Sequence, residues 1–230
     1  MTQSVLITGA NRGLGLEFTR QFAKNNFTVF ACCRDPDNAD ELNALQNKHQ
    51  NIQLFSLEIS SMASIQLLQK EITQPIDILL NNAGILEEDP AFGALSIENF
   101  SQSFLVNAVS PLKVTEAFKE NLAKSSLKLV VCITSRIGSI SENHSGGYYS
   151  YRTSKTALNM LMKTAAFDLA LEGIRVLLLH PGWVKTRMGG TEAALTPTES
   201  VSGMIKVITN YQTIPPEVMF YNYKGEEIPW

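Results

Sequence analysis

Tyr151 and Lys155 lie four residues apart in the sequence Tyr-Arg-Thr-Ser-Lys, near the start of a long helix-like segment. Residues at this spacing share one face of a helix, so the ammonium group would lie close to the phenol. A free tyrosine has a pKa near 10 and is a poor acid at neutral pH, and a nearby positive charge lowers that pKa. A tyrosine tuned in this way can donate a proton to a carbonyl oxygen or accept one from an alcohol. The spacing also occurs by chance on many helices, so its meaning depends on the rest of the chain.

The segments that would hold this pair alternate between short apolar stretches and helix-like stretches along the whole chain. We expect strands at residues 5–7, 27–33, 52–57, 76–80, 127–134, 174–179 and 218–221. We expect helices at residues 13–25, 37–49, 62–72, 97–122, 151–171 and 198–210. Strands separated by helices pair in parallel, and strands that are apolar throughout belong to a sheet covered on both faces. The sequence therefore predicts one doubly wound α/β domain over residues 1–230.

The composition is that of a globular protein: the 230 residues are 44% apolar and 18% charged, and the formal net charge is −3. Because there is no basic stripe, we expect no nucleic-acid binding by charge attraction, and no apolar run is long enough to span a bilayer. The first residues lack the features of a signal peptide, and Cys32, Cys33 and Cys132 are poorly placed to pair, so we expect a cytoplasmic protein. The three histidines are scattered, so we expect no metal site.

Two glycine-containing loops follow predicted strands. The turn from Thr8 to Gly15 joins the first strand to the first helix, and its glycines would let the backbone approach a pyrophosphate at the positive end of that helix. A tight turn without a ligand would also use glycines, but the position directly after the first strand favours binding. The segment Asn81-Asn82-Ala83-Gly84 follows the fourth strand, where a doubly wound sheet presents its strand ends to a cofactor.

Together these motifs resemble the short-chain dehydrogenase/reductase family, and the resemblance covers nearly the whole chain. The matching elements follow the family's order: the turn from Thr8 to Gly15, the loop from Asn81 to Gly84, Asn107, Ser135, Tyr151 with Lys155, and Pro181-Gly182 followed by Thr186. Residues 133–140, 151–155 and 188–190 further resemble the carbonyl-reductase branch, which includes sniffer-like and C-factor-like proteins. The resemblance implies a Rossmann fold with about seven parallel strands in the order 3-2-1-4-5-6-7 and helices on both faces.

The resemblance also implies catalytic roles for four residues. Tyr151 would be the general acid/base, while Lys155 would lower its pKa and bind the nicotinamide ribose. Ser135 would orient the substrate oxygen and stabilise its developing negative charge. Asn107 would hold a water that links Lys155 to solvent. Ser135 precedes Tyr151 by sixteen residues and Ser139 by twelve, whereas about thirteen is usual in the family; we prefer Ser135, which ends the fifth strand, and keep Ser139 as the alternative.

A further set of residues would contact a nicotinamide cofactor if the resemblance holds. Besides Tyr151 and Lys155, they are Gly9, Asn11, Arg12, Gly13, Leu14, Gly15, Arg34, Glu58, Ile59, Asn82, Ala83, Gly84, Pro181, Gly182, Val184 and Thr186. Val184 and Thr186 would hold the nicotinamide carboxamide. Glu58 stands where relatives often carry an aspartate that meets the adenine amine.

The end of the second strand indicates which nicotinamide cofactor would bind. An NAD-specific site places a carboxylate there, which bonds the ribose 2′-hydroxyl and would repel a 2′-phosphate. In this chain the position is Cys33, Arg34 follows it, and Arg12 lies in the glycine turn. Two guanidinium groups suit a phosphate, so we predict NADP(H). A shift of one residue would offer Asp35 instead, and both arginines could also be solvated loop residues.

The helix predicted at residues 151–171 is apolar around most of its circumference, with a narrow polar stripe at Arg152, Thr156, Asn159 and Lys163. A helix of this kind is buried on two sides. The sheet would cover one side, and a second copy of the chain or another part of the same chain would cover the other. Members of the resembled family use such helices to form dimers and tetramers, so we predict a homodimer, with a tetramer as an option.

The sequence thus predicts an NADPH-dependent oxidoreductase that reduces a ketone, aldehyde or quinone carbonyl and can also oxidise the alcohol. The alternative is a non-catalytic NADP(H)-binding regulatory or signalling protein with the same fold. A small-molecule substrate would be selected by the loops at residues 86–92, 139–149 and 187–197. The last of these loops is short, which indicates an open substrate site.

Overall fold

A computed structural model describes residues 2–87, 92–213 and 219–230 of the chain. Its strands are β1 (Ser4–Thr8), β2 (Thr28–Cys33), β3 (Ile52–Ser56), β4 (Ile78–Asn81), β5 (Leu129–Ile133), β6 (Arg175–His180) and β7 (Met219–Asn222). Its α-helices are α1 (Gly13–Lys24), α2 (Asp40–Lys48), α3 (Met62–Glu71), α4 (Ile97–Phe104), α5 (Ser110–Ala117), α6 (Lys119–Ala123), α7 (Tyr149–Ala170) and α8 (Pro197–Thr209). A π-helical turn, η1 (Leu105–Val109), and two 3₁₀ turns, η2 (Arg136–Gly138) and η3 (Tyr211–Thr213), complete the elements.

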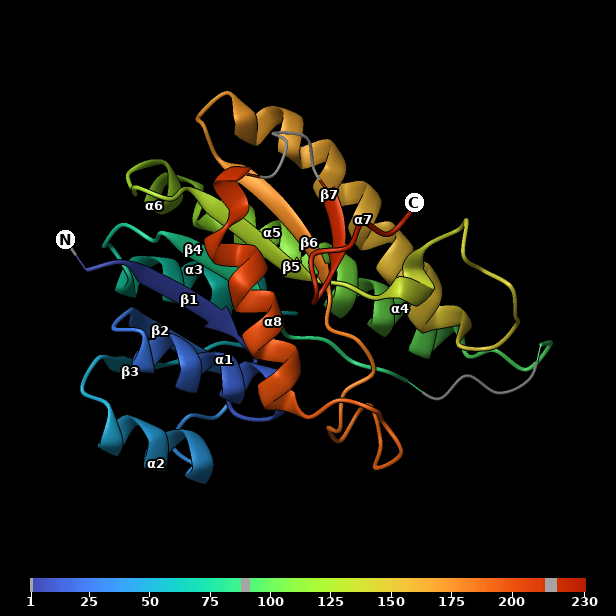
Figure 1. The fold of residues 1–230 in the computed structure, drawn as a ribbon, viewed down its shortest axis with the longest axis horizontal. Coiled ribbons are helices and arrows are strands. Elements are labelled where there is room, and N and C mark those ends of the chain that lie inside the picture. Colours follow the sequence, from blue (N-terminus) through green and yellow to red (C-terminus); the bar gives the residue numbers. More distant parts are fainter. Residues whose placement is uncertain (1, 88–91, 214–218) are drawn as a thin grey trace.

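The seven strands form one parallel sheet in the order β3-β2-β1-β4-β5-β6-β7. Figure 1 shows the strands running in a common direction, so that the loops after β1, β2, β4, β5 and β6 gather at one edge of the sheet. We call this edge the carboxyl edge. The predicted fold class and strand order are therefore confirmed.

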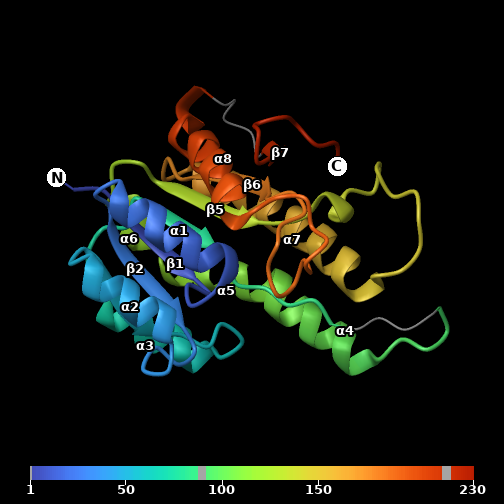
Figure 2. The ribbon, with the colours of Figure 1, turned by 60° about the horizontal axis from the view of Figure 1, so that its bottom comes forward.

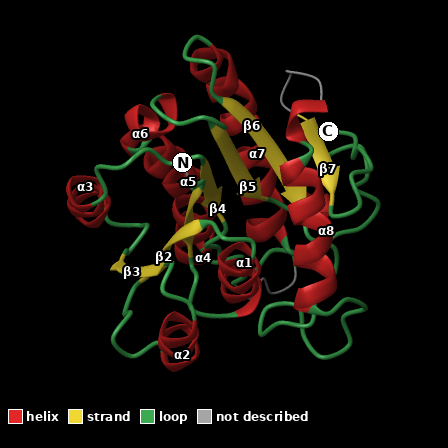
Figure 3. Cartoon of the chain, turned by 60° about the vertical axis from the view of Figure 1, so that its left-hand side comes forward, coloured by secondary structure: helices red, strands yellow, loops and turns green. Residues whose placement is uncertain are grey.

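Helices cover both faces of the sheet, as Figure 3 shows. On one face, α1, α2 and α8 pack on side chains such as Val5 and Ile7, and on the other face α3, α5, α6 and α7 pack on side chains such as Leu6. Because successive residues of a strand point to opposite faces, a strand buried on both sides must be apolar at every position. The uninterrupted apolar runs of the sequence are therefore the direct cause of the two cores.

The single helix predicted at residues 97–122 is wrong, because the chain there forms α4, the π-helical turn η1, α5 and α6 in succession. Pro111 explains part of the interruption: it has no N–H to donate to the carbonyl of Asn107 four residues earlier. The hydroxyl of Ser110 donates to the carbonyl oxygen of Leu105 at 2.7 Å and stabilises the widened turn. Single π-helical turns inside helices often occur at functional sites, and this one contains Asn107.

Other element boundaries differ from the predicted ones by at most three residues. The helix α7 begins at Tyr149 and not at Tyr151, directly after Tyr148, whose φ of 52° places it in the left-handed region. Tyr151 and Lys155 therefore lie in the first two turns of α7. Residue 218, predicted to begin the last strand, lies outside the described residues.

Candidate active site

The glycine turn and the Asn-Ala-Gly loop lie against each other at the carboxyl edges of β1 and β4. The hydroxyl of Thr8 accepts hydrogen bonds from the backbone N–H groups of Asn82 and Ala83, each at 3.0 Å. A Cβ atom on Gly15 would lie 2.0 Å from the carbonyl oxygen of Gly9, and one on Gly9 would lie 3.1 Å from the Cα of Ala83. These positions admit only glycine because two backbone segments approach too closely for a side chain.

The segment after β6 lies on the other side of the same turn. A Cβ atom on Gly13, whose φ is +55°, would lie 3.5 Å from the Cγ2 of Thr186. The segment is held by a bridge between Val184 and Leu195 and by the hydroxyl of Ser200, which donates to the Pro181 carbonyl oxygen at 2.6 Å. The structure thus brings the residues from Pro181 to Thr186 beside the start of α1.

Asn107 joins three segments of the site through its side-chain amide, and it is fully buried. Its Oδ1 accepts from the N–H of Ile85 at 2.9 Å, while its Nδ2 donates to the Ile85 carbonyl oxygen at 2.9 Å and to the Ser154 Oγ at 3.1 Å. Both N–H groups of this amide are used by the protein, whereas the main-chain carbonyl of Asn107 lacks its usual helical donor because residue 111 is proline, so this carbonyl is available to a water.

Lys155 is buried beside this junction. A Cβ atom on Gly84 would lie 3.1 Å from the Oδ1 of Asn107 and 3.6 Å from the Nζ of Lys155, so the three residues are neighbours. The Lys155 Nζ donates to the Ile133 carbonyl oxygen at 2.9 Å and lies 5.7 Å from the centre of the Tyr151 ring. Burial lowers the pKa of the Lys155 ammonium to about 8 because the charged form loses solvent.

Tyr151 shares a hydrogen bond with the hydroxyl of Ser135, which lies two residues after β5 and directly before η2. Burial raises the pKa of the Tyr151 phenol to about 12, and the bond to Ser135 opposes the rise. The lowering of this pKa by Lys155 stays a prediction for the site with its cofactor in place. Burial acts in the opposite direction because desolvation disfavours the phenolate, and the Lys155 ammonium bonds the Ile133 carbonyl.

Ser139, the alternative catalytic serine, faces another part of the chain. Its hydroxyl reaches the carbonyl oxygen of Pro229 at 2.6 Å and that of Trp230 at 3.0 Å, and it also accepts from the N–H of Glu142 at 3.2 Å. Ser135 is therefore the serine that the fold brings to Tyr151. This distinction depends on the last residues of the chain, which no local motif around Ser139 reveals.

The residues predicted to surround the adenosine end are arranged around the start of α1. Arg12 precedes α1 and is exposed, and the first turn of this helix contains no acidic residue. Cys33 is buried at the end of β2, whereas the Arg34 side chain is exposed and its guanidinium lies 3.8 Å from the Glu58 carboxylate. Glu58 also accepts from the Ser60 hydroxyl at 2.8 Å. Exposed guanidinium groups such as those of Arg12 and Arg34 are suited to binding a phosphate group.

The remaining predicted contact residues take different positions. Leu14 and Ile59 are partly buried and pack on the apolar cores, and Asn11 is partly buried in the glycine turn. Two residues of the site were not predicted: Ile85 and Ser154, which hold the Asn107 amide. Ser154 lies inside the Tyr-Arg-Thr-Ser-Lys motif, but only the tertiary contact with Asn107 identifies its part in the site.

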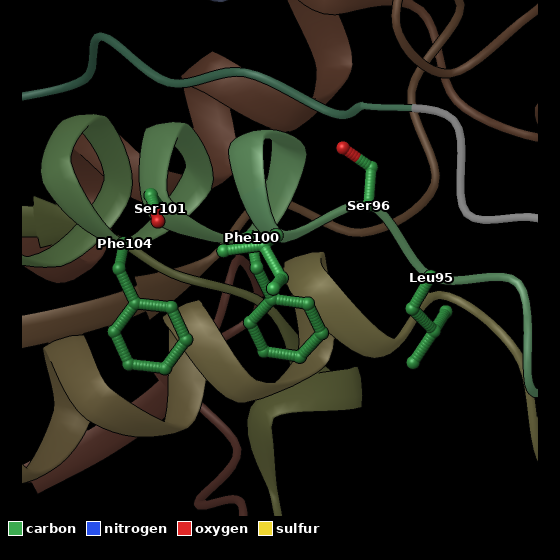
Figure 4. Close-up of a pocket in the computed structure, with 6 residues that line it drawn as sticks. Leu95, Ser96, Phe100, Ser101 and Phe104 are labelled. Carbon is green, nitrogen blue, oxygen red and sulfur yellow. The ribbon is translucent and has the colours of Figure 1, made fainter.

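An apolar pocket of about 430 Å³ lies apart from these residues on α4. It is lined by Leu95, Ser96, Ile97, Phe100, Ser101 and Phe104. Figure 4 shows the rings of Phe100 and Phe104 next to each other on one side of α4, with centres 6.0 Å apart. Within the described residues, no group of three or more His, Cys, Asp or Glu side chains could hold a metal ion. No helix in the described ranges has the length and apolar character to cross a membrane.

Comparison with known proteins places this fold and site in a family. The family model described as short chain dehydrogenase matches residues 3–195, so the chain belongs to the short-chain dehydrogenase family. This confirms the family that the sequence motifs predicted.

Three similar proteins have informative names. The chain is 43% identical over 160 residues to the C-signal of Myxococcus xanthus, which covers 69% of this chain and 95% of that protein. The structure resembles that of an NADPH-bound carbonyl reductase from chicken fatty liver, with 35% identity, a TM-score of 0.92 and coverage of 100% and 99% of the two chains. It also resembles the carbonyl reductase Sniffer of D. melanogaster, with 31% identity, a TM-score of 0.91 and full coverage of both chains.

The stability of the chain should depend on His180, which ends β6 directly before Pro181. Burial, together with the charge of Arg136, lowers the pKa of His180 from 6.5 to about 4, and its buried Nδ1 has no hydrogen-bond partner in the described residues. The unfolded chain therefore binds a proton more readily, and stability falls as the pH drops from about 6.5 to about 4. We expect His180 to account for roughly 2 to 3 kcal/mol of the unfolding free energy lost over this pH range, and His180→Asn should abolish that part of the loss.

Urea unfolding at a series of pH values measures this effect. The exposed His144 offers a matched control, since His144→Asn should leave the pH dependence unchanged. Equal slopes for wild type and His180→Asn between pH 4 and 6.5 would contradict the assignment.

Proposed function

We propose that this chain is an NADPH-dependent oxidoreductase, a single Rossmann domain over residues 1–230, that reduces the carbonyl of a ketone, aldehyde or quinone and can oxidise the corresponding alcohol. The observation that carries the proposal is the hydrogen-bonded pair of Ser135 and Tyr151, which adjoins a buried Lys155 at the carboxyl edge of the sheet. The likeness to carbonyl reductases of known structure supports the same conclusion.

In this proposal Tyr151 is the general acid for carbonyl reduction. Because the pKa of its phenol is raised to about 12, the group carries a proton at neutral pH and can donate it to the substrate oxygen. Ser135 holds the same oxygen and stabilises the negative charge that develops on it. Lys155 returns a proton to Tyr151, and a water held by the main-chain carbonyl of Asn107 links Lys155 to solvent protons. Alcohol oxidation requires the phenolate and so depends more strongly on the positive charge of Lys155.

The chain would hold the cofactor along the carboxyl edge with residues from the loops after β1, β4 and β6 and with Lys155 of α7. The turn from Gly9 to Gly15 and the N-terminus of α1 would bind the pyrophosphate, and the loop from Asn82 to Gly84 would lie beneath the ribose. Lys155 would bond the nicotinamide ribose, and Val184 and Thr186 would fix the carboxamide. When bound, NADPH supplies the hydride.

Arg12 and Arg34 would select NADP(H) over NAD(H). Both side chains are exposed, Arg12 directly before α1 and Arg34 directly after β2, and the end of β2 carries the buried Cys33 where an NAD-specific site has a carboxylate. Glu58, which lies near Arg34 and bonds Ser60, orients the guanidinium and leaves it accessible to a phosphate. The NADPH-bound carbonyl reductase from chicken supports this preference.

The second candidate function is a non-catalytic NADP(H)-binding regulatory or signalling protein. The observation that favours it is the 43% identity to a relative named C-signal. Ser135, Tyr151 and Lys155 count against it, since a protein without turnover does not need a proton donor at this position. Turnover of a carbonyl substrate distinguishes the two candidates.

We also propose that two copies of the chain associate through α4 and α7. These helices pack against each other, and Figures 1 and 2 show them side by side at one end of the molecule. Apolar side chains remain exposed on both: Ile97 and Leu105 at α4, and Met160, Phe167 and Leu171 at α7. On α7 these residues recur at spacings of seven and four, so they share one face. A face of this kind is covered most simply by a two-fold related copy.

The setting we propose is the reducing cytoplasm. Cys32, Cys33 and Cys132 are buried and unpaired in the described structure, and burial raises the pKa of each thiol. Buried, protonated thiols do not readily form disulfides, so they are compatible with a reducing compartment.

Replacing Tyr151 by phenylalanine tests the enzyme directly. Tyr151→Phe removes the proton donor but keeps the ring, so we expect NADPH oxidation with a panel of ketones, aldehydes and quinones to fall by at least about a hundredfold. Absorbance of NADPH measures turnover, and cofactor fluorescence should show unchanged NADPH binding. Tyr211→Phe is the matched control, because the Tyr211 hydroxyl bonds the Leu127 carbonyl oxygen before β5, at the opposite edge of the sheet. Tight NADPH binding by the wild-type chain without turnover on any compound would favour the regulatory alternative.

Replacing Arg34 by aspartate tests the cofactor preference. The change removes a phosphate ligand and adds a repelling charge, so the Kd for NADPH should rise at least about tenfold. The Kd for NADH in the same variant is the internal control and should change little. Unchanged preference for NADPH would refute the roles of Arg12 and Arg34.

Multi-angle light scattering at micromolar concentration tests the association. Phe167 is 74% exposed, and Phe167→Asp places a charge at the proposed interface, so we expect the dimer mass to fall to the monomer mass. Leu67→Asp is the control, because Leu67 is 60% exposed on α3, away from this face. A monomeric wild-type protein would overturn the proposal.

A further inference from the structure

One row of polar side chains on α7 packs against the chain itself. Arg152, Thr156, Asn159 and Lys163 recur at spacings of four, three and four, so they lie on one face of the helix. We call these four residues the polar row. The structure shows each of them in contact with the segment from Thr134 to Gly147 or with Trp230. We call residues 134–147 the serine segment, since it begins directly before Ser135.

Arg152 binds the far part of the serine segment with three groups of its guanidinium. Its Nε donates to the Gly147 carbonyl oxygen at 3.0 Å, its Nη1 to the Asn143 Oδ1 at 3.0 Å, and its Nη2 to the Ser145 Oγ at 2.9 Å. Arg152 adjoins Tyr151 in the sequence. The same residue therefore fixes a loop of residues 143–147 relative to the first turns of α7.

Two members of the polar row hold the start of the serine segment on both sides of Ser135. The hydroxyl of Thr134 donates to the Asn159 Oδ1 at 2.7 Å, and the hydroxyl of Thr156 donates to the Gly138 carbonyl oxygen at 2.9 Å. Gly138 packs directly on α7, because a Cβ atom there would lie 2.9 Å from the Cβ of Lys155.

Trp230 holds the middle of the serine segment. Its carbonyl oxygen accepts from the N–H of Ile140 at 2.7 Å and from the N–H of Ser141 at 3.1 Å. Its ring lies under the Lys163 ammonium, with the Nζ 4.4 Å from the ring centre. The polar row thus reaches the middle of the segment through Trp230, in addition to its direct contacts at both ends.

We propose that Arg152 is a positioning residue that holds the serine segment on α7 and so keeps the Ser135 hydroxyl at hydrogen-bonding distance from Tyr151. The proposal rests on the reductase function proposed above. Sixteen residues separate Ser135 from Tyr151, and between η2 and Tyr149 the connection has no regular structure. A connection of this length explores many conformations unless contacts restrain it, and small displacements of catalytic groups cost large factors in rate.

A double-mutant test separates positioning from general stability. If Arg152 acts through Ser135, Arg152→Ala should lower kcat by about tenfold in the wild type but by less than about twofold in a Ser135→Ala background. The Kd for NADPH should stay unchanged, since the polar row lies away from the glycine turn. Equal losses of kcat in the two backgrounds would overturn the proposal.

Hydrogen-deuterium exchange tests the restraint without relying on turnover, so it distinguishes failure of this proposal from failure of the reductase function. The amides of Ile140, Ser141, Glu142 and Asn143 are hydrogen-bonded, and in Arg152→Ala we expect them to exchange at least about tenfold faster. Asn143→Ala, which removes one contact from the loop side, should produce a smaller increase. Arg20→Gln, a helix arginine paired with Glu17 on α1, is the control and should leave these amides unchanged. Unchanged exchange in Arg152→Ala would show that the segment is held by other means.

Discussion

Polar groups at the carboxyl edge of the sheet must find partners within the protein, because two apolar cores close over both faces of the strands. The fully buried amide of Asn107 meets this requirement for three segments at once. It bonds both backbone groups of Ile85 and the hydroxyl of Ser154, and so joins the loop after β4, the π-helical turn and α7. Without the Asn107 amide, the backbone groups of Ile85 and the hydroxyl of Ser154 would lose a hydrogen-bond partner. This cost restrains the positions of the segments around Lys155.

The same burial sets the electrostatics of the site. Desolvation moves the pKa of Lys155 down to about 8 and that of Tyr151 up to about 12, because it disfavours the charged form of each group. The two shifts bring the pair toward its neutral state, in which the phenol keeps its proton. A partly buried phenol that keeps its proton is suited to donating it to a carbonyl oxygen and less suited to removing one from an alcohol.

Three different faces of the helix α7 face the sheet, the serine segment and solvent. One face packs on the sheet through Leu158 and Met162, and a second carries the polar row that binds the serine segment. A third leaves Met160, Phe167 and Leu171 exposed. All three faces belong to one helix. The positions of the core, the serine segment and the proposed interface relative to Tyr151 are therefore all set by α7. A helix as long as α7 has room for all three faces, which gives a physical reason why it carries the proposed catalytic residues Tyr151 and Lys155.

The sequence by itself determined the alternation of strands and helices, the parallel pairing and the positions of the loops, since apolar runs, glycine turns and helix spacing are local signals. The order of the strands in the sheet followed from the family resemblance. Only the tertiary structure decided between Ser135 and Ser139, because the answer depends on where Pro229 and Trp230 fold back. It also decided the direction of the Tyr151 pKa, since burial is a property of the whole molecule. The partners of Arg152 lie five to nine residues away in a loop without periodicity, so only the folded chain identifies them. The break in the helix predicted at residues 97–122 has a local cause in Pro111, which the apolar pattern does not encode.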